Sequence, residues 1–235
     1  MFWALTSWGG RGLTRPRREV RLGRGVSVSY SRFSNFPEAC FLPLPSRISM
    51  HAWHDIYIDD DLIEKELPVV IEVPKGSKNK YELDKETGFL RLDRVLYSAV
   101  YYPANYGFIP RTFCDDGDPL DALVLGQEAL QPLTMVDARA IGVMRMRDEK
   151  GIDDKIIAVS TKDPAFSGFT HHNELPDHTL RQIQRFFQDY KLLENKQVVV
   201  DDFMGPDEAA DIVREALDLY RKLRRGELSY KKAHV

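Results

Sequence analysis

From residue 67 onward the chain is dominated by short segments with β-type hydrophobic patterns, and this pattern constrains the fold most. Residues 67–73 form an apolar run that carries a single acid, Glu72, and predict a buried strand. Residues 80–84 and 89–94 alternate polar and apolar side chains around a Lys-Glu-Thr-Gly turn, which predicts a hairpin. Further strands are expected over 121–125, about 134–146, 155–160 and 197–200. Several short strands at close spacing favour a small barrel or a sandwich.

Two amphipathic helices are predicted near the C-terminus. After Pro176, one helical face collects Leu180, Ile183, Phe187 and Tyr190. After Pro206, a second stripe collects Ile212, Val213, Ala216, Leu219, Tyr220 and Leu223, and Gly226 ends it. Both stripes are expected to face the core. The predicted fold is mainly β with α, a β-barrel with helices packed outside it.

Residues 115–121, Asp-Asp-Gly-Asp-Pro-Leu-Asp, place four carboxylates within seven residues. Crowded anions repel one another, and hard divalent cations such as Mg²⁺, Mn²⁺ or Ca²⁺ relieve that repulsion. Pro119 stiffens the segment, and a buried strand follows it, so a rigid metal site is indicated. An acidic surface turn is the plain alternative, because Asp and Gly are common turn residues. An EF-hand counted from Asp116 fails, since Asp121 and Gln127 stand where Gly and Glu are required.

Composition excludes several classes of protein. The 235 residues are 43% hydrophobic and 29% charged, which is typical of a globular protein. The net charge of −3 gives no nucleic-acid footprint. Cys40 and Cys114 lie far apart, which argues against a disulfide framework or a zinc site and fits a reducing compartment. No apolar run approaches the roughly 18 residues of a membrane span. We therefore expect neither a nucleic-acid nor a membrane partner.

Residues 1–49 have a different composition, with eight Arg, no Lys, and only Glu19 and Glu38 as acids. A boundary is expected near Met50, between a leader over 1–49 and a single domain over 50–235. An Arg-rich, acid-poor and Ser-bearing leader is typical of an organelle transit peptide. The alternatives are a disordered leader or a start placed too early, with Met50 the true beginning. The expected location is the cytoplasm, or an organelle if the leader is a transit peptide.

Polar residues also appear where strands should be apolar. Lys80 and Glu82 lie two apart on a strand, so their side chains leave the same face. Residues 102–107 predict a rigid aromatic turn, and residues 148–155 a second acidic turn. Each feature also has an ordinary interpretation as a paired surface charge, a core aromatic or a solvated turn.

Together these residues indicate one charged cavity. Seven acids would outnumber four bases there: Glu72, Glu82, Asp116, Asp118, Asp121, Asp148 and Asp153 against Lys80, Arg94, Lys155 and Lys191. Such a cavity repels an anion until divalent ions bind, and then it can hold a compact, highly charged anion. The chemistry that needs this arrangement is metal-assisted phosphoryl transfer to water.

The segment Asp116-Gly117-Asp118-Pro119-Leu120-Asp121-Ala122 resembles the D-x-D-P-x-D signature of the soluble family I inorganic pyrophosphatases. Further segments look like family blocks in family order: 70–74, 80–84, 93–95, 101–107, 148–155 and 186–191. The resemblance covers about residues 51–224, and residues 51–55 and 75–78 look like the plant and plant-like bacterial branch. Leu120 stands where Ile or Val is usual in the family, and Ala122 stands where many members have Val. Only packing effects are expected from these two differences. The leader has no family counterpart.

The resemblance implies an OB-like closed β-barrel that hydrolyses pyrophosphate to two orthophosphates by direct attack of a metal-activated hydroxide. It implies several Mg²⁺ ions, for which Mn²⁺ could substitute, and a homo-oligomer. The implied metal ligands are Asp116, Asp121, Asp148, Asp153 and Glu72. The implied general base is Asp118, with Tyr106 orienting the base and the nucleophile. Phosphate oxygens would be bound by Lys80, Arg94, Tyr190 and Lys191, supported by Glu82, Tyr102 and Lys155.

Two rival interpretations stay open at this stage. An OB-like barrel could bind an anion or a single-stranded nucleic acid without catalysis, with Tyr101, Tyr102 and Tyr106 as stacking residues. Seven acids on the same face argue against that. A metal-dependent nuclease or phosphatase is the second rival, although a cavity closed by four bases suits a small anion better. The histidines at 51, 54, 171 and 172 lack a suitably spaced third ligand for zinc and are expected at the surface.

Overall fold

The computed structural model describes residues 50–149 and 151–229, so the predictions for residues 1–49 lie outside the described residues. The strands are β1 (Leu67–Val73), β2 (Asn79–Leu83), β3 (Leu90–Val95), β4 (Asn105–Phe108), β5 (Asp121–Leu125), β6 (Met135–Asp148), β7 (Gly151–Ile152), β8 (Lys155–Ser160) and β9 (Val199–Met204). The helices are α1 (Asp177–Asp189) and α2 (Pro206–Arg224), with short 3-10 turns η2 (Asp60–Leu62), η3 (His172–Glu174) and η4 (Leu192–Glu194).

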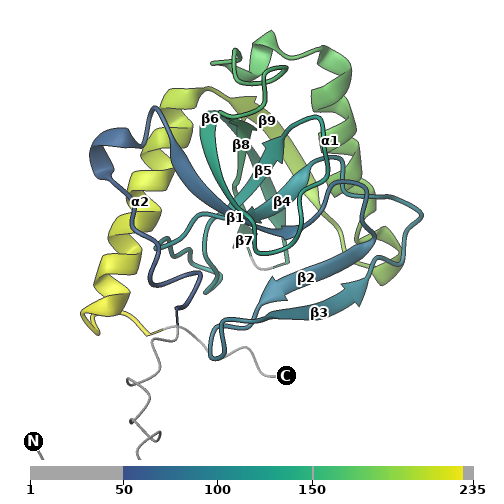
Figure 1. The fold of residues 1–235 in the computed structure, drawn as a ribbon. Helices are drawn as coiled ribbons and strands as arrows, with labels where there is room; N and C mark the ends of the chain where they lie inside the picture. Colours follow the sequence, from purple (N-terminus) through teal and green to yellow (C-terminus); the bar gives the residue numbers. More distant parts are fainter. Residues whose placement is uncertain (1–49, 150, 230–235) are drawn as a thin grey trace, which may run out of the picture. The chain divides into compact units, whose positions relative to one another are not determined.

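The main sheet closes on itself. Its strand order is β1-β4-β5-β8-β6-β7, with β9 also paired to β6, and a further β1–β6 pairing returns the sheet to its first strand. The pairs are antiparallel except for β5 and β8, which run parallel. At 14 residues, β6 is long enough to pair with four other strands, and its register shifts near Gly142 and Met146. The predicted mainly β fold flanked by helices is confirmed (Figure 1).

Strands β2 and β3 form a separate two-stranded hairpin beside the closed sheet (Figure 1). Lys80 on β2 lies opposite Arg94 on β3, and the register shifts after Lys80. Leu83 is buried with Phe108, so one end of the hairpin is anchored to the main sheet. Two cations are thereby placed on an element that is separate from the strands carrying the acids.

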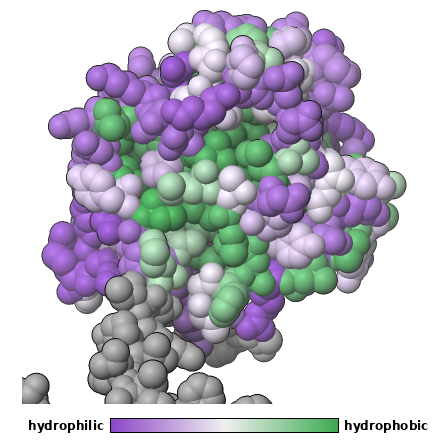
Figure 2. Space-filling model, viewed as in Figure 1, coloured by the Kyte–Doolittle hydropathy of each residue, from purple (hydrophilic) through white to green (hydrophobic). Residues whose placement is uncertain are grey.

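The two helices cover different parts of the hydrophobic core. Val213 and Leu217 of α2 pack with residues of β1, β6 and β8. Ile183 and Phe187 of α1 belong to a second cluster, with residues of β5 and β6. The predicted apolar stripes therefore face the core, as expected. On the face drawn in Figure 2, hydrophobic residues gather in the middle, between more hydrophilic areas. None of the helices in the described residues is long and apolar enough to cross a membrane.

Two local predictions were wrong and a third was incomplete. Part of the predicted aromatic turn is instead strand β4, a four-residue strand that is buried throughout and pairs with both β1 and β5. The second acidic turn contains the two-residue strand β7, which pairs back onto β6. The last strand spans Val199–Met204 rather than 197–200. A four-residue segment with a central glycine looks like a turn, and only its pairing on both sides makes it a strand.

Candidate active site

Glu72 lies on β1 inside the protein and is 6% exposed. Its Oε1 accepts a hydrogen bond of 2.7 Å from the backbone N–H of Leu83, which ties the closed sheet to the hairpin. Burial, and next the nearby Asp121, raise the pKa of Glu72 well above its usual value. The acid that interrupts the first strand is therefore a buried part of the network and not an edge-strand surface charge.

The acidic loop is a tight turn around Gly117, whose φ of +90° falls in the left-handed region that glycine tolerates. The Gly117 N–H donates to the carbonyl of Cys114 (3.0 Å), and the Cys114 N–H donates to the carbonyl of Asp118 (2.8 Å). Within the turn, the Asp118 N–H donates to Oδ1 of Asp116 at 3.1 Å. Burial, and next the Asp118 charge, raise the pKa of Asp116. The turn thus holds two carboxylates close together.

Lys155 lies at the centre of the acids. The parallel pairing of β5 with β8 places it opposite Asp121, and its Nζ contacts the carboxylates of both Asp121 and Asp153. Burial opposes the ammonium charge of Lys155, but the two carboxylates outweigh it and its pKa is raised. Burial raises the pKa of Asp121 to about 6, with Lys155 counteracting and Asp153 adding to the rise. A single buried cation therefore holds two acids from different elements.

A second ion pair joins α1 to β6. Lys191, just beyond the end of α1, donates from Nζ to Oδ2 of Asp148 at 2.7 Å. Tyr190, the residue that ends the helix, is 5% exposed, and burial raises the pKa of its hydroxyl. The helix end thus supplies two of the predicted anion-binding groups.

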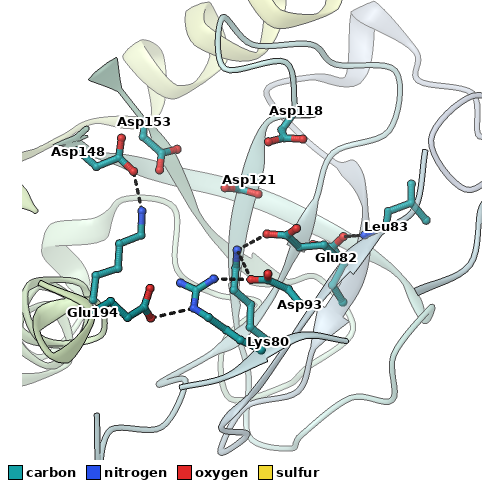
Figure 3. A network of polar contacts seen from close by, with 12 residues as sticks. Lys80, Glu82, Leu83, Asp93, Asp118, Asp121, Asp148, Asp153 and Glu194 are labelled. Atoms are coloured by element: carbon teal, nitrogen blue, oxygen red, sulfur yellow. Dashed lines mark hydrogen bonds and ion pairs between the residues drawn. The ribbon is translucent and has the colours of Figure 1, made fainter. Parts of the chain in front are cut away.

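The hairpin supplies the other two predicted anion-binding groups. Lys80 Nζ contacts Glu82 and lies 3.4 Å from Oδ2 of Asp93. Arg94 contacts Asp93 and donates from Nε to Glu194 at 2.8 Å. In Figure 3, Asp118, Asp121, Asp148 and Asp153 lie on one side of the site, and Lys80, Glu82 and Asp93 lie on the other. The residues that sequence analysis grouped are therefore brought together.

Two tyrosines form an inner wall of the site. The rings of Tyr102 and Tyr106 lie 5.3 Å apart and pack against Phe186 and Phe187 of α1. The Tyr106 hydroxyl is hydrogen bonded to Asp121, and burial followed by that carboxylate raises the pKa of Tyr106 well above its usual value. Tyr106 is therefore a hydrogen-bond donor at neutral pH.

Three members of the network were not predicted from the sequence: Lys85, Asp93 and Glu194. Lys85 Nζ contacts the Asp118 carboxylate and donates to the Gly117 carbonyl at 2.8 Å. It belongs to the hairpin turn, and nothing local in the sequence links that turn to the acidic loop. Asp93 could have been found, because it adjoins Arg94 in a segment already singled out. Glu194 lies in η4, and only its contact with Arg94 reveals it.

The chemistry of the donors suits a hard divalent cation. Within residues 50–149 and 151–229, no three acidic, imidazole or thiol side chains converge closely enough to hold an ion without rearrangement. The reason is visible in the contacts, because lysines bridge or cap the carboxylates of Asp121, Asp153, Asp118 and Asp148. Burial is the main cause of the raised pKa values of Glu72, Asp116 and Asp121, and neighbouring carboxylates add to it. A bound Mg²⁺ would stabilise the charged form of each of these acids. These residues fit Mg²⁺ once the lysines give way.

The four histidines are half-buried and not at the surface as expected. His51 and His54 stack at 4.4 Å beside Trp53, and His171 and His172 lie 4.5 Å apart at η3. Each pair is packed into the fold and lies outside the carboxylate network.

Fold and site together define a closed β-sheet protein whose interior carries a carboxylate network linked by buried lysines. Residues 69–221 match the family model described as inorganic pyrophosphatase, and the chain belongs to this family. The soluble inorganic pyrophosphatase 2 of Chlamydomonas reinhardtii is 52% identical over 172 residues, covering 73% of this chain and 89% of the relative. A soluble inorganic pyrophosphatase of Solanum tuberosum is 48% identical over 208 residues, covering 88% of this chain and 92% of the relative.

Solved structures show the same relationship. The inorganic pyrophosphatase of Helicobacter pylori is 46% identical with a TM-score of 0.67, covering 71% of this chain and 98% of that one. The inorganic pyrophosphatase of Thermus thermophilus is 40% identical with a TM-score of 0.68, covering 71% of this chain and 97% of that one. The family resemblance and the fold inferred from it are thus confirmed.

Proposed function

We propose that this protein hydrolyses inorganic pyrophosphate to two orthophosphates in a Mg²⁺-dependent reaction, with Mn²⁺ as a substitute. Membership of the inorganic pyrophosphatase family supports the substrate. The observation that carries the mechanism is the lysine–carboxylate network. In it, Asp118 of the acidic loop contacts Lys85 of the hairpin turn, Asp121 and Asp153 contact Lys155 of β8, and Asp148 contacts Lys191 beyond the end of α1. Such a site has the donors for metal ions and the cations for phosphate.

The ions would be held by Asp116, Asp121, Asp148, Asp153 and Glu72. When bound, Mg²⁺ supplies charge neutralisation and lowers the pKa of the attacking water. Asp118 accepts the proton of that water, since its carboxylate lies in the same turn as Asp116 and is held by Lys85. Tyr106 donates a hydrogen bond and thereby orients the groups around Asp121.

Three cationic side chains and one tyrosine would then act on the substrate. Lys80 and Arg94 from the hairpin, with Tyr190 and Lys191 from the end of α1, bind phosphate oxygens and stabilise the leaving group. Glu82, Tyr102 and Lys155 support them, with Lys155 positioning two carboxylates and Glu82 holding Lys80. Phosphoryl transfer of this kind depends on positioning and charge neutralisation, so no phosphoenzyme is required.

The nucleic-acid-binding alternative is disfavoured by burial. Tyr102 and Tyr106 are 2% and 6% exposed, because they pack against α1. A stacking platform for bases needs accessible ring faces. Of the three tyrosines considered for that role, Tyr101 alone is exposed.

Orthophosphate release from pyrophosphate by the purified chain tests the proposal. We expect rapid release with Mg²⁺, no release with excess chelator, and no hydrolysis of ATP or nucleic acid under the same conditions. Folded protein that releases no orthophosphate with Mg²⁺ or Mn²⁺ would refute it.

We further propose that the protein is a homo-oligomer in the cytoplasm, or in an organelle if residues 1–49 are a transit peptide. Exposed apolar side chains on and after β3, namely Leu92, Val95, Tyr97 and Tyr101, support self-association. Sedimentation velocity and the location of a fluorescent fusion test the two parts separately.

Metal binding is expected to weaken below pH 6. In the metal-free protein Asp121 has a pKa of about 6, so Mg²⁺ must displace a proton at lower pH, and its apparent affinity falls by up to about tenfold per pH unit. Because the pKa of Asp121 is raised only in the folded protein, the unfolded chain loses this proton at a lower pH than the folded chain does. The contribution of Asp121 to the free energy of unfolding of the metal-free protein therefore declines as pH rises from about 4 to about 6. Calorimetric Mg²⁺ titrations between pH 5 and 7.5, without substrate, measure the effect. A pH-independent affinity would contradict it.

Lys85→Met is expected to lower kcat/KM about tenfold. The substitution removes the ammonium that holds both the Asp118 carboxylate and the Gly117 carbonyl, and a hydrogen bond to a charged group contributes about 1.5–3 kcal/mol. Steady-state kinetics with pyrophosphate check this. Lys162→Met is the matched control, because Lys162 is 71% exposed and pairs with Glu66 and Asp137 at the surface. Equal kinetics for the two variants would show that Lys85 does not position the loop.

A further inference from the structure

A pocket lies between the segment that precedes β1 and the C-terminal part of α2. Its volume is about 610 Å³, and none of its lining residues belongs to the carboxylate network. The surface over this end of α2 is hydrophilic (Figure 2). The volume falls within the roughly 300–1,000 Å³ of small-molecule sites.

Four arginines line this pocket, and they differ in how they are paired. Arg221 is bound to Asp60 and Asp218, and Arg225 is bound to Glu227. Arg111 and Arg224 have no carboxylate within ion-pair distance in the part of the chain that the structure describes. Two guanidinium groups on one pocket are therefore available to an anion, and guanidinium groups bind phosphate through paired hydrogen bonds.

Arg111 is held in an unfavourable backbone conformation. Its φ of +54° is left-handed, which costs a non-glycine residue about 1 kcal/mol or more. Two hydrogen bonds hold it there: its backbone N–H donates to the Trp53 carbonyl at 2.9 Å, and its Nε donates to the His54 carbonyl at 3.0 Å. Its guanidinium lies 5.8 Å from the centre of the Tyr57 ring. The surrounding structure thus fixes the position of one unpaired cation.

Aromatic rings form the remaining wall. His54 and Tyr220 stack at 5.8 Å and are joined by a hydrogen bond of 2.8 Å. Burial, then His51 and Arg224, lower the pKa of His54 to about 4, so the ring is neutral at pH 7. The Tyr57 residue is 71% exposed. The pocket therefore combines free cations with accessible and neutral aromatic surface.

We propose that this pocket binds a nucleoside phosphate, with Arg111 and Arg224 on the phosphate and the base against the ring of Tyr57. Asp59 and Asp61, which also line the pocket, can accept hydrogen bonds from ribose hydroxyl or amino groups. Cation–π and stacking contacts distinguish such a ligand from orthophosphate alone.

The pocket is also joined to the acidic loop. Next to Arg111, the Thr112 hydroxyl accepts from the Leu120 N–H at 2.8 Å, and the Phe113 N–H donates to the Ala216 carbonyl of α2 at 2.9 Å. The loop that carries Asp116 and Asp118 therefore starts at a pocket residue.

Calorimetric titration of the full-length protein with ADP, in metal-free buffer and without pyrophosphate, tests binding independently of catalysis. Arg224→Gln should weaken ADP binding about tenfold, whereas Lys222→Gln, which removes the same charge nearby on α2 outside the pocket, should change it less than about twofold. No saturable ADP binding at millimolar concentration, or equal weakening by both substitutions, would overturn the site. Orthophosphate binding as tightly as ADP would overturn the nucleoside assignment.

Discussion

Asp118→Asn is expected to lower kcat for pyrophosphate about 10²–10⁴-fold while leaving Mg²⁺ affinity almost unchanged. The amide has the shape of the carboxylate but cannot accept a proton from water at neutral pH. Asp118 differs from its neighbours because Lys85 holds it from the hairpin, whereas Asp121 and Asp153 share the buried Lys155. We propose proton transfer and not metal ligation for Asp118 on the family resemblance, and the contact with Lys85 fixes the position of its carboxylate.

The measurement pairs steady-state kinetics with calorimetric Mg²⁺ titration on the same preparation. Asp115→Asn is the matched control, because Asp115 is an exposed acid of the same loop and makes none of the network contacts described above. We expect the control to retain activity within about twofold. Full activity in Asp118→Asn would defeat the base assignment. Loss of Mg²⁺ affinity in step with kcat would make Asp118 a metal ligand instead.

Gly107→Ala is expected to destabilise the fold by at least about 3 kcal/mol, enough to leave much of the protein unfolded or insoluble. A Cβ at this position would lie 1.9 Å from the carbonyl oxygen of Val70 and 2.8 Å from Cα of Ile71. Both are backbone atoms of β1, so no side chain can move aside. Because β4 is paired to β1 and β5 in a closed sheet, it cannot shift without breaking pairs on one side.

Urea unfolding followed by circular dichroism measures this effect. Gly168→Ala is the matched control, since a Cβ there meets nothing within 4 Å and φ is not positive. That variant should be unchanged or slightly more stable, because alanine reduces the freedom of the unfolded chain. A Gly107→Ala protein with native stability would show that β1 and β4 lie farther apart than they do in this structure.

Much of the architecture could be predicted from hydrophobic periodicity. The strands over 67–73, 121–125 and 155–160 coincide with β1, β5 and β8, and both amphipathic helices face the core where their stripes indicated. Strand β4 could not be recognised, since four residues around a glycine lack a period long enough to measure. The short strand β7 within the second acidic turn was missed for the same reason.

The sequence by itself determined which side chains are available for chemistry: a dense acidic loop, an acid within a buried strand, and cations at matching positions in the hairpin and after α1. Only the tertiary structure decided which of them touch. Asp121 and Lys155 are 34 residues apart and meet because β5 and β8 run parallel and adjacent, and Lys85 reaches Asp118 because the hairpin turn lies against the acidic loop. Local patterns report only the burial and spacing of each segment, whereas ion pairs depend on which segments become neighbours when the sheet closes.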